Sequence, residues 1–117
     1  MNDKQFYDLY SGALEESCRE VYVTDWVQSS IWNDDEYYEI SQERIEAVGA
    51  IWDMAHASMK DIRACTGLSQ FDFAQRFCIP KRTVEDWEAG RRTCPPYVHL
   101  LLAQAVNMYK REEQDIS

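Results

Sequence analysis

Apolar side chains recur along the first part of this chain at the spacing of a helix. Asn2 or Asp3 can cap a first helix. Its apolar positions are Phe6, Tyr7, Leu9, Tyr10, Ala13 and Leu14. Residues 21–23 fit either a short extended piece or the frayed end of that helix. Thr24 is then expected to cap a short second helix, whose apolar face consists of Trp26, Val27, Ile31 and Trp32.

Serines mark the starts of the next helices. Ser41 can cap a helix whose apolar stripe is Ile45, Val48, Ile51, Trp52 and Ala55. Ser58 and Asp61 have the spacing of a capping box, and Gly67 is expected just past the end of that helix. Its expected inner residues are Met59, Ile62, Ala64 and Cys65.

The remaining pattern predicts three more short segments. Ser69 caps a helix with Phe73, Ala74 and Phe77 facing inward. After a turn at residues 78–80, a helix over residues 80–89 buries Thr83, Val84 and Trp87, and Gly90 ends it. Residues 91–96 are a loop, because two prolines cannot continue a helix. The final helix starts near Tyr97, with core candidates Val98, Leu101, Leu102, Ala105, Val106 and Tyr109.

Strand patterns are almost absent, so the chain is expected to be all-α, with about six or seven short helices. No apolar run approaches the roughly 18 residues of a membrane span, and the N-terminus lacks the pattern of a signal peptide. We therefore expect a cytoplasmic protein.

Charge divides the chain more sharply than hydropathy does. The net charge of −9 combines three bases and thirteen acids in residues 1–57 with eight bases and five acids in residues 58–110. The tail 111–117 adds one base and three acids. This asymmetry predicts an acidic helical N-terminal region (1–57), used for dimerisation or partner binding, a basic domain (58–110) and a polar tail. Only the basic domain can approach phosphate favourably.

Neither the cysteines nor the histidines have the spacing of a metal site. Cys18, Cys65, Cys78 and Cys94 contain no C-x-x-C pair, and the two histidines are scattered. We expect free thiols packed as small apolar groups, and no metal or other cofactor. No carboxylate pair is coupled to a histidine, a glycine-rich loop or a nucleophile motif, so we do not expect an enzyme.

One segment of the basic domain carries a specific combination of residues. It reads Gly67-Leu68-Ser69-Gln70-x-x-Phe73-Ala74-x-x-Phe77-Cys78-Ile79-Pro80-x-x-Thr83-Val84-x-x-Trp87-Glu88-x-Gly90. This string resembles the helix-turn-helix of the lambda-repressor-like, or XRE, family, and the resemblance covers about residues 58–106. It implies a lambda-repressor-like bundle with an N-terminal helical extension. Cys78 stands where the family usually has glycine, so the turn is expected either to adopt a left-handed conformation or to differ slightly.

The resemblance, with the residue chemistry, indicates a sequence-specific DNA-binding transcriptional regulator. The helix 80–89 would enter the major groove and present Pro80, Lys81, Arg82, Glu85, Asp86 and Ala89 outward. Expected base contacts are Lys81, Arg82, Asp86 and Glu85, although the two acids could instead pair with neighbouring cations. Expected phosphate contacts are Gln70, Arg91, Arg92 and Thr83. Arg63 and Arg76 fit either a DNA contact or a solvated helix face.

The expected partners are double-stranded DNA and a second copy of the chain, which together describe a homodimeric repressor on a palindromic operator. The alternative function is that of an antitoxin or mobile-element inhibitor, whose acidic half binds a protein while the helix-turn-helix autoregulates. The tryptophans are expected in the core. Trp26, Trp32, Tyr37 and Tyr38 could instead form a partner surface.

Overall fold

The computed structural model describes residues 1–34 and 38–111 of the 117-residue chain. Within these ranges the chain forms seven α-helices and one short 3-10 helix, with no strand, which confirms the all-α expectation. The helices are α1 (Asp3–Glu15), α2 (Arg19–Val27), η1 (Ser30–Trp32), α3 (Gln42–Ala55), α4 (Met59–Ala64), α5 (Gln70–Arg76), α6 (Lys81–Ala89) and α7 (Pro96–Ala105). None of them is long and apolar enough to cross a membrane.

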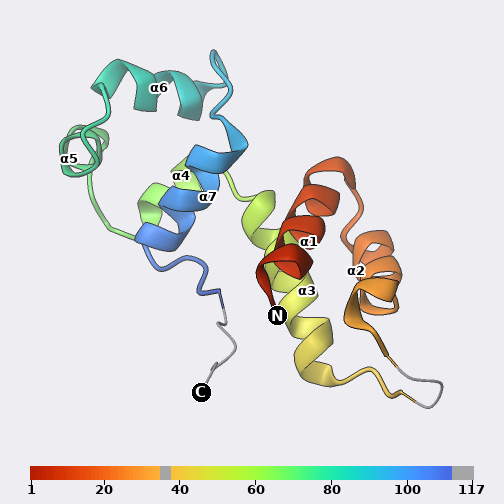
Figure 1. Ribbon diagram of the computed structural model, residues 1–117. Coiled ribbons are helices and arrows are strands. Elements are labelled where there is room, and N and C mark those ends of the chain that lie inside the picture. The colour runs from red at the N-terminus through yellow and green to blue at the C-terminus, as the bar shows by residue number, and fades with distance from the viewer. Residues whose placement is uncertain (35–37, 112–117) are drawn as a thin grey trace. The chain divides into compact units, whose positions relative to one another are not determined.

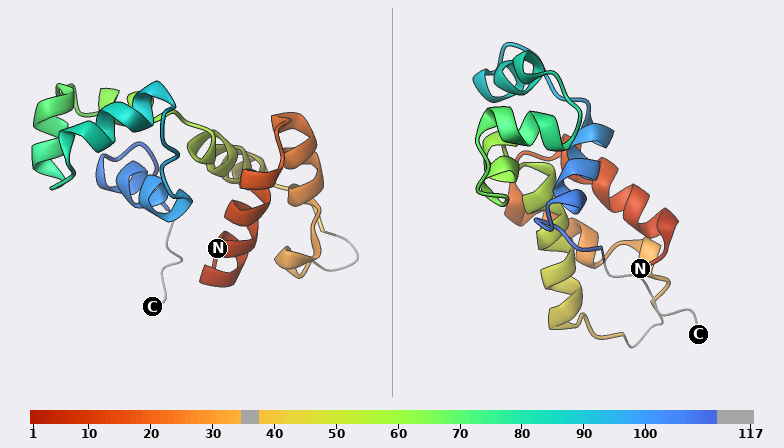
Figure 2. Two further views of the ribbon diagram at one scale, coloured as in Figure 1. Left: turned by 90° about the horizontal axis from the view of Figure 1, so that it is seen from above. Right: turned by 90° about the vertical axis from the view of Figure 1, so that its left-hand side faces the viewer.

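The chain folds into two compact units, each with its own core. The first unit contains Met1–His56 together with Arg111, and the second contains Ala57–Lys110. Helices α1, α2 and α3 build the first unit, in which α3 packs against both α1 and α2 (Figure 1). Helices α4 to α7 build the second unit, in which α6 contacts both α4 and α5, and α7 contacts α4 (Figure 2).

Local capping and a buried tyrosine define the first unit. The Asn2 side chain accepts a hydrogen bond from the Gln5 backbone N–H, and the Gln5 side chain accepts one from Asn2 N–H, each at 2.8 Å. Tyr22 is fully buried and donates its hydroxyl to the Leu9 carbonyl at 2.6 Å. This bond fixes α2 against α1 without leaving a buried hydroxyl unsatisfied.

The second predicted helix was wrong in both position and cap. Residues 21–23 lie inside α2, and Thr24 is an interior residue of that helix, not its N-cap. Trp26 belongs to the last turn of α2, whereas Trp32 lies in the separate helix η1. Burial of Tyr22 accounts for the difference, because tertiary packing overrides the weak helix preference of the β-branched residues around it.

The second unit follows the predicted caps closely. Ser58 and Asp61 form the capping box of α4, and the Ser69 hydroxyl accepts from the Asp72 N–H at the start of α5. Gly67 and Gly90 adopt positive φ angles of 69° and 77°, which glycine permits without steric cost. Pro96 is the first residue of α7, so the preceding loop ends one residue earlier than predicted.

Several predicted core positions were wrong. Ala64 and Cys65 at the end of α4, and Leu101 and Ala105 on α7, are exposed, while Ala103 is fully buried. The four tryptophans are half-buried, not fully buried. The cysteines are free, but three of them are exposed and Cys94 is half-buried, so they are not packed as small apolar groups.

Candidate functional site

Helices α5 and α6 form a pair joined by a tight turn. Ala74 on α5 is buried and Val84 on α6 is fully buried, and the small alanine side chain leaves room for the close crossing of the two helices. The Ile79 N–H donates to the Ala74 carbonyl at 2.9 Å. Cys78 adopts φ +54°, the left-handed alternative expected for this turn.

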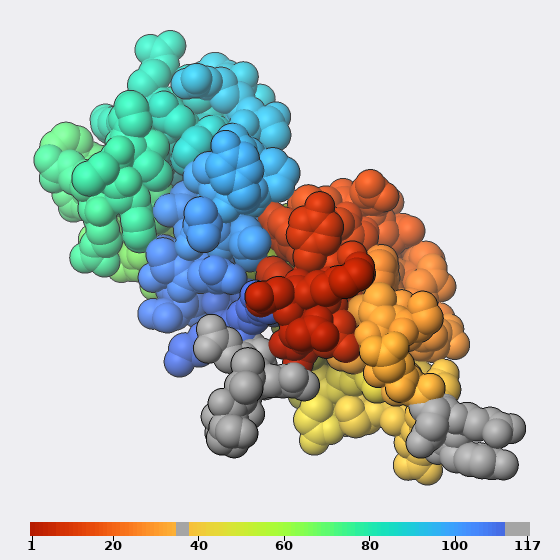
Figure 3. Space-filling model, in the orientation of Figure 1, coloured from red at the N-terminus to blue at the C-terminus, as the bar shows by residue number. Residues whose placement is uncertain are grey.

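The first turn of α6 carries two exposed cations. The side chains of Lys81 and Arg82 are 53% and 80% exposed. Each is paired with an acid one turn further along α6, Lys81 with Glu85 at 3.4 Å and Arg82 with Asp86 at 3.5 Å. These long contacts involve exposed cations, so they contribute little to stability and leave both cations available to a ligand. α6 lies at the surface of the second unit, where Figure 3 shows it in teal.

Asp86 differs from its predicted position on the outward face. It is buried, with only 7% of the residue exposed. Its carboxylate accepts the Arg91 Nε–H at 2.8 Å, and its backbone carbonyl accepts the N–H groups of Arg91 and Arg92 at 2.9 and 3.3 Å. The chain turns back after Gly90 and places Arg91 against this side of α6. A helical projection, which ends with the helix, cannot reveal that contact.

Asp86 is held as a carboxylate by its neighbours. The hydrogen bond from Arg91, together with the charges of Arg91, Arg82 and Arg92, lowers the pKa of Asp86 below its ordinary value of 3.8, although desolvation opposes this shift. Arg92 also reaches α6, where its Nη1 lies 3.5 Å from the Thr83 hydroxyl. The structure thus brings Thr83, Arg82, Arg91 and Arg92 together around Asp86.

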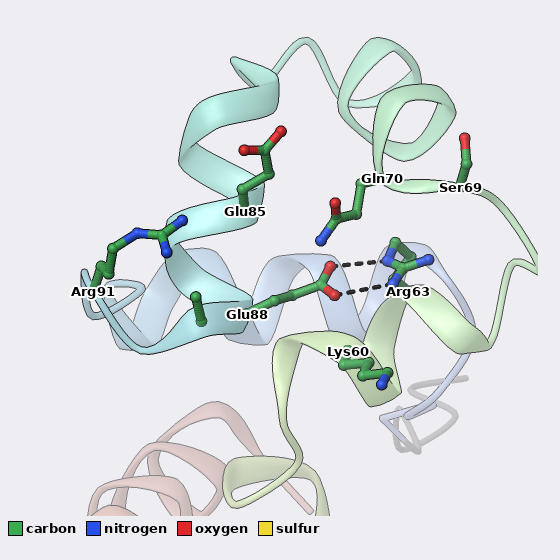
Figure 4. A pocket seen from close by; sticks show the side chains of 8 residues that line it. Lys60, Arg63, Ser69, Gln70, Glu85, Glu88 and Arg91 are labelled. Carbon is green, nitrogen blue, oxygen red and sulfur yellow. Dashed lines mark hydrogen bonds and ion pairs between the residues drawn. The ribbon is translucent and has the colours of Figure 1, made fainter.

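Gln70, the predicted phosphate contact on α5, lies over an ion pair that sequence reasoning missed (Figure 4). Arg63 on α4 donates Nε and Nη2 to the Glu88 carboxylate on α6 at 2.8 and 2.9 Å, and Nη1 to the Leu68 carbonyl at 2.9 Å. The hydrogen bond from Arg63 is the largest cause of a lowered Glu88 pKa, and the Gln70 side chain adds to it. Both side chains are mostly buried, at 20% and 8% exposed. Arg63 is therefore neither a solvated residue nor a free DNA contact.

Near this ion pair lies an open polar groove. Its lining residues are Lys60, Arg63, Ser69, Gln70, Glu85, Glu88, Ala89 and Arg91. Cations and carboxylates both line the groove: Lys60 and Arg63 lie next to each other on α4, and Glu85 and Arg91 lie on its α6 side (Figure 4). Arg76, at the end of α5, is exposed and stays a candidate for either role.

The aromatic residues proposed as a partner surface are partly engaged within the first unit. Trp32 donates its indole N–H to the Trp26 carbonyl at 2.8 Å, and the Arg44 guanidinium lies 4.6 Å from the centre of the Trp32 ring. Tyr38 is 42% exposed, and Tyr37 lies outside the described residues. A partner surface at these residues stays a prediction.

Comparison with known proteins adds no relative. No model of a protein family matches the chain, and neither does a curated protein or a solved structure. Within residues 1–34 and 38–111, no group of three or more His, Cys, Asp or Glu side chains could hold a metal ion. The residues around α5 and α6 therefore provide the physical basis for a function.

Proposed function

We propose that this protein is a sequence-specific DNA-binding transcriptional regulator, and that the α5–α6 pair is a lambda-repressor-like helix-turn-helix that places α6 in the major groove. One observation carries the proposal. Four exposed cations, Lys81, Arg82, Arg91 and Arg92, gather on α6 and the loop that follows it, next to a tightly packed helix pair. The second unit has a net charge of +3, from eight bases and five acids, in a chain whose net charge is −9.

The exposed groups match the chemistry of duplex DNA. Lys81 and Arg82 lie in the first turn of α6, the part of a recognition helix that usually meets base edges. An arginine fork suits guanine O6 and N7. Arg91 and Arg92 follow α6 and suit phosphate oxygens, which fix the orientation of the helix. Asp86 is buried, so in this proposal it does not read a base, whereas Glu85 stays a candidate for doing so.

The overall negative charge favours specificity in this scheme. Non-specific binding to DNA is mostly electrostatic, and a chain with net charge −9 is repelled by phosphate at long range. Binding must then depend on the local cations and on base contacts. A strong dependence on salt, with little affinity for arbitrary sequences, is the expected signature.

A homodimer is part of the proposal, and α7 offers a surface for it. Tyr97 and Leu101 lie one turn apart on α7 and are 68% and 61% exposed. The helix contains no Asp, Glu, Lys or Arg, so the same face of a second copy can approach without repulsion between like charges. Sedimentation equilibrium should detect a dimer, and Leu101→Glu should shift it toward the monomer. If the unaltered chain is a monomer at micromolar concentration, the homodimer is excluded.

The DNA-binding proposal is tested by selecting duplexes from a random pool with the unaltered chain and then titrating the selected duplex at two salt concentrations. Lys81→Gln/Arg82→Gln removes two charges from α6, and Lys4→Gln/Lys110→Gln removes two exposed charges elsewhere. We expect the first variant to lose binding and the control to retain it. Equal losses in both would indicate attraction by net charge alone, and no binding by the unaltered chain at low salt would exclude the proposal.

A further inference from the structure

The carboxylate of Asp86 is buried and contacts the side chains of two exposed arginines, Arg82 and Arg91. We propose that Asp86 is a positioning residue, which holds the guanidinium groups of Arg82 and Arg91 by their Nε sides so that their Nη groups face DNA. The inference rests on the proposed function and deepens it. It assigns to Asp86 an indirect role in recognition, in place of a direct base contact.

Two hydrogen bonds join Arg91 to Asp86. The Asp86 Oδ1 atom accepts the Arg91 Nε–H at 2.8 Å, and the Asp86 carbonyl accepts the Arg91 backbone N–H at 2.9 Å. The Arg91 side chain is nevertheless 58% exposed. The Arg91 backbone and Nε are therefore both fixed by Asp86, while the rest of the exposed guanidinium lies beside the groove next to α6 (Figure 4).

The same carboxylate oxygen also forms a longer ion pair with Arg82. The Arg82 Nε atom lies 3.5 Å from Asp86 Oδ1, and this side chain is 80% exposed. Among residues 1–34 and 38–111, no hydrogen bond occupies the Nη atoms of Arg82 or Arg91. An arginine uses its two Nη groups, or one of them with Nε, to bind phosphate or guanine in a bidentate manner. The hydrogen bond at Arg91 Nε leaves the Arg91 Nη pair as the remaining fork, while the longer ion pair to Asp86 restrains Arg82 more weakly.

Preorganisation of this kind lowers the cost of binding. A free arginine side chain loses rotamer entropy when a ligand fixes it, and a carboxylate that already fixes it reduces that loss. Two simpler roles of Asp86 predict different results. As a base acceptor, it would have to lie at the surface, which its 7% exposure argues against. As a mere source of negative charge, it would weaken DNA binding, so its neutralisation would strengthen the complex.

The test measures affinity for a duplex selected by the unaltered chain in four proteins: unaltered, Asp86→Asn, Arg82→Lys/Arg91→Lys, and the triple variant. Asn removes the charge at nearly the same volume, and Lys keeps the charge of each arginine but lacks its fork. We expect Asp86→Asn to weaken binding about tenfold, equivalent to about 1.4 kcal/mol, although it makes the chain less negative. In the double-lysine background, the same substitution should cause no further loss.

Two controls separate this role from a structural one. Circular dichroism must show that each variant is folded at the assay temperature. In the free protein, the Arg91 Nε–H signal should be protected from exchange relative to that of Arg82, and it should lose this protection in Asp86→Asn. The proposal is overturned if Asp86→Asn strengthens binding, or if it weakens binding equally in both backgrounds. If the unaltered chain selects no duplex, the proposed function itself fails.

Discussion

Removal of the Glu88 carboxylate should destabilise the second unit more than any single change on the outer side of α6. Glu88→Ala leaves the Arg63 guanidinium, only 20% exposed, with the Leu68 carbonyl as its remaining partner. Breaking a buried ion pair by removing one partner costs about 3–5 kcal/mol. Arg63 is partly exposed and keeps its hydrogen bond to the Leu68 carbonyl, so we expect a cost at the lower end of that range, about 3 kcal/mol. A domain of this size has a total stability of only about 3–8 kcal/mol.

The assay must report on the second unit alone, because the chain contains two units and its unfolding need not be two-state. Amide hydrogen exchange followed by mass spectrometry on peptides from residues 57–110 meets this need. Glu88→Ala should speed exchange in these peptides by a factor of about one hundred or more, as about 3 kcal/mol requires. Arg63→Met/Glu88→Leu should recover much of the loss, because it removes both charges together.

The pH dependence of stability provides a second test of the Arg63–Glu88 ion pair. The Glu88 pKa is lowered from its ordinary value of 4.5 in the folded chain. Its contribution to stability is therefore complete above pH 4.5 and is lost as the pH falls through the lowered value. Glu88→Gln should show a smaller loss of stability over that acidic range than the unaltered chain. A Glu88→Ala effect below about 1 kcal/mol, or identical acid profiles of Glu88→Gln and the unaltered chain, would show that this ion pair does not stabilise the second unit.

Three further predictions concern backbone strain, close packing and thiol exposure. Cys78→Gly should raise the free energy of unfolding of the second unit by about 0.5–1 kcal/mol, because it relieves φ +54° at an exposed side chain; urea dependence of exchange measures this, and a decrease would contradict it. Gly12→Ala should lower the melting temperature of the first unit, since the new Cβ would clash with the Trp26 ring; an unchanged thermal transition by circular dichroism would disprove that packing. Cys94, half-buried and with a pKa raised by desolvation, should react with iodoacetamide more slowly than exposed Cys65; equal rates by peptide mass spectrometry would argue against its burial.

The helix caps could be predicted from sequence because their physics is local. Ser41, Ser58 and Ser69 each accept the backbone N–H three residues later, as their positions before apolar runs indicated. Gly67 and Gly90 mark the ends of α4 and α6 for the same reason, since a left-handed residue there favours glycine. These signals were enough to place the segments around the candidate site.

What the sequence could not give was the result of contacts between distant residues. Tyr22 lies in a stretch with a strand-like composition, but its hydroxyl bonds to Leu9, thirteen residues earlier, within a helical unit. Arg63 and Glu88 are separated by 25 residues, and no spacing rule links them. Asp86 is buried because the chain folds back after Gly90, beyond the range in which helical periodicity applies.

The most direct test of the central claim is selection of DNA from a random duplex pool, with the unaltered chain and Lys81→Ala/Arg82→Ala in parallel at two salt concentrations. We predict that the unaltered chain enriches a symmetric motif, with half-sites about one helical turn apart, and that the variant loses this enrichment. Failure of the unaltered chain to enrich any sequence, even at low salt where phosphate attraction is strongest, would contradict it.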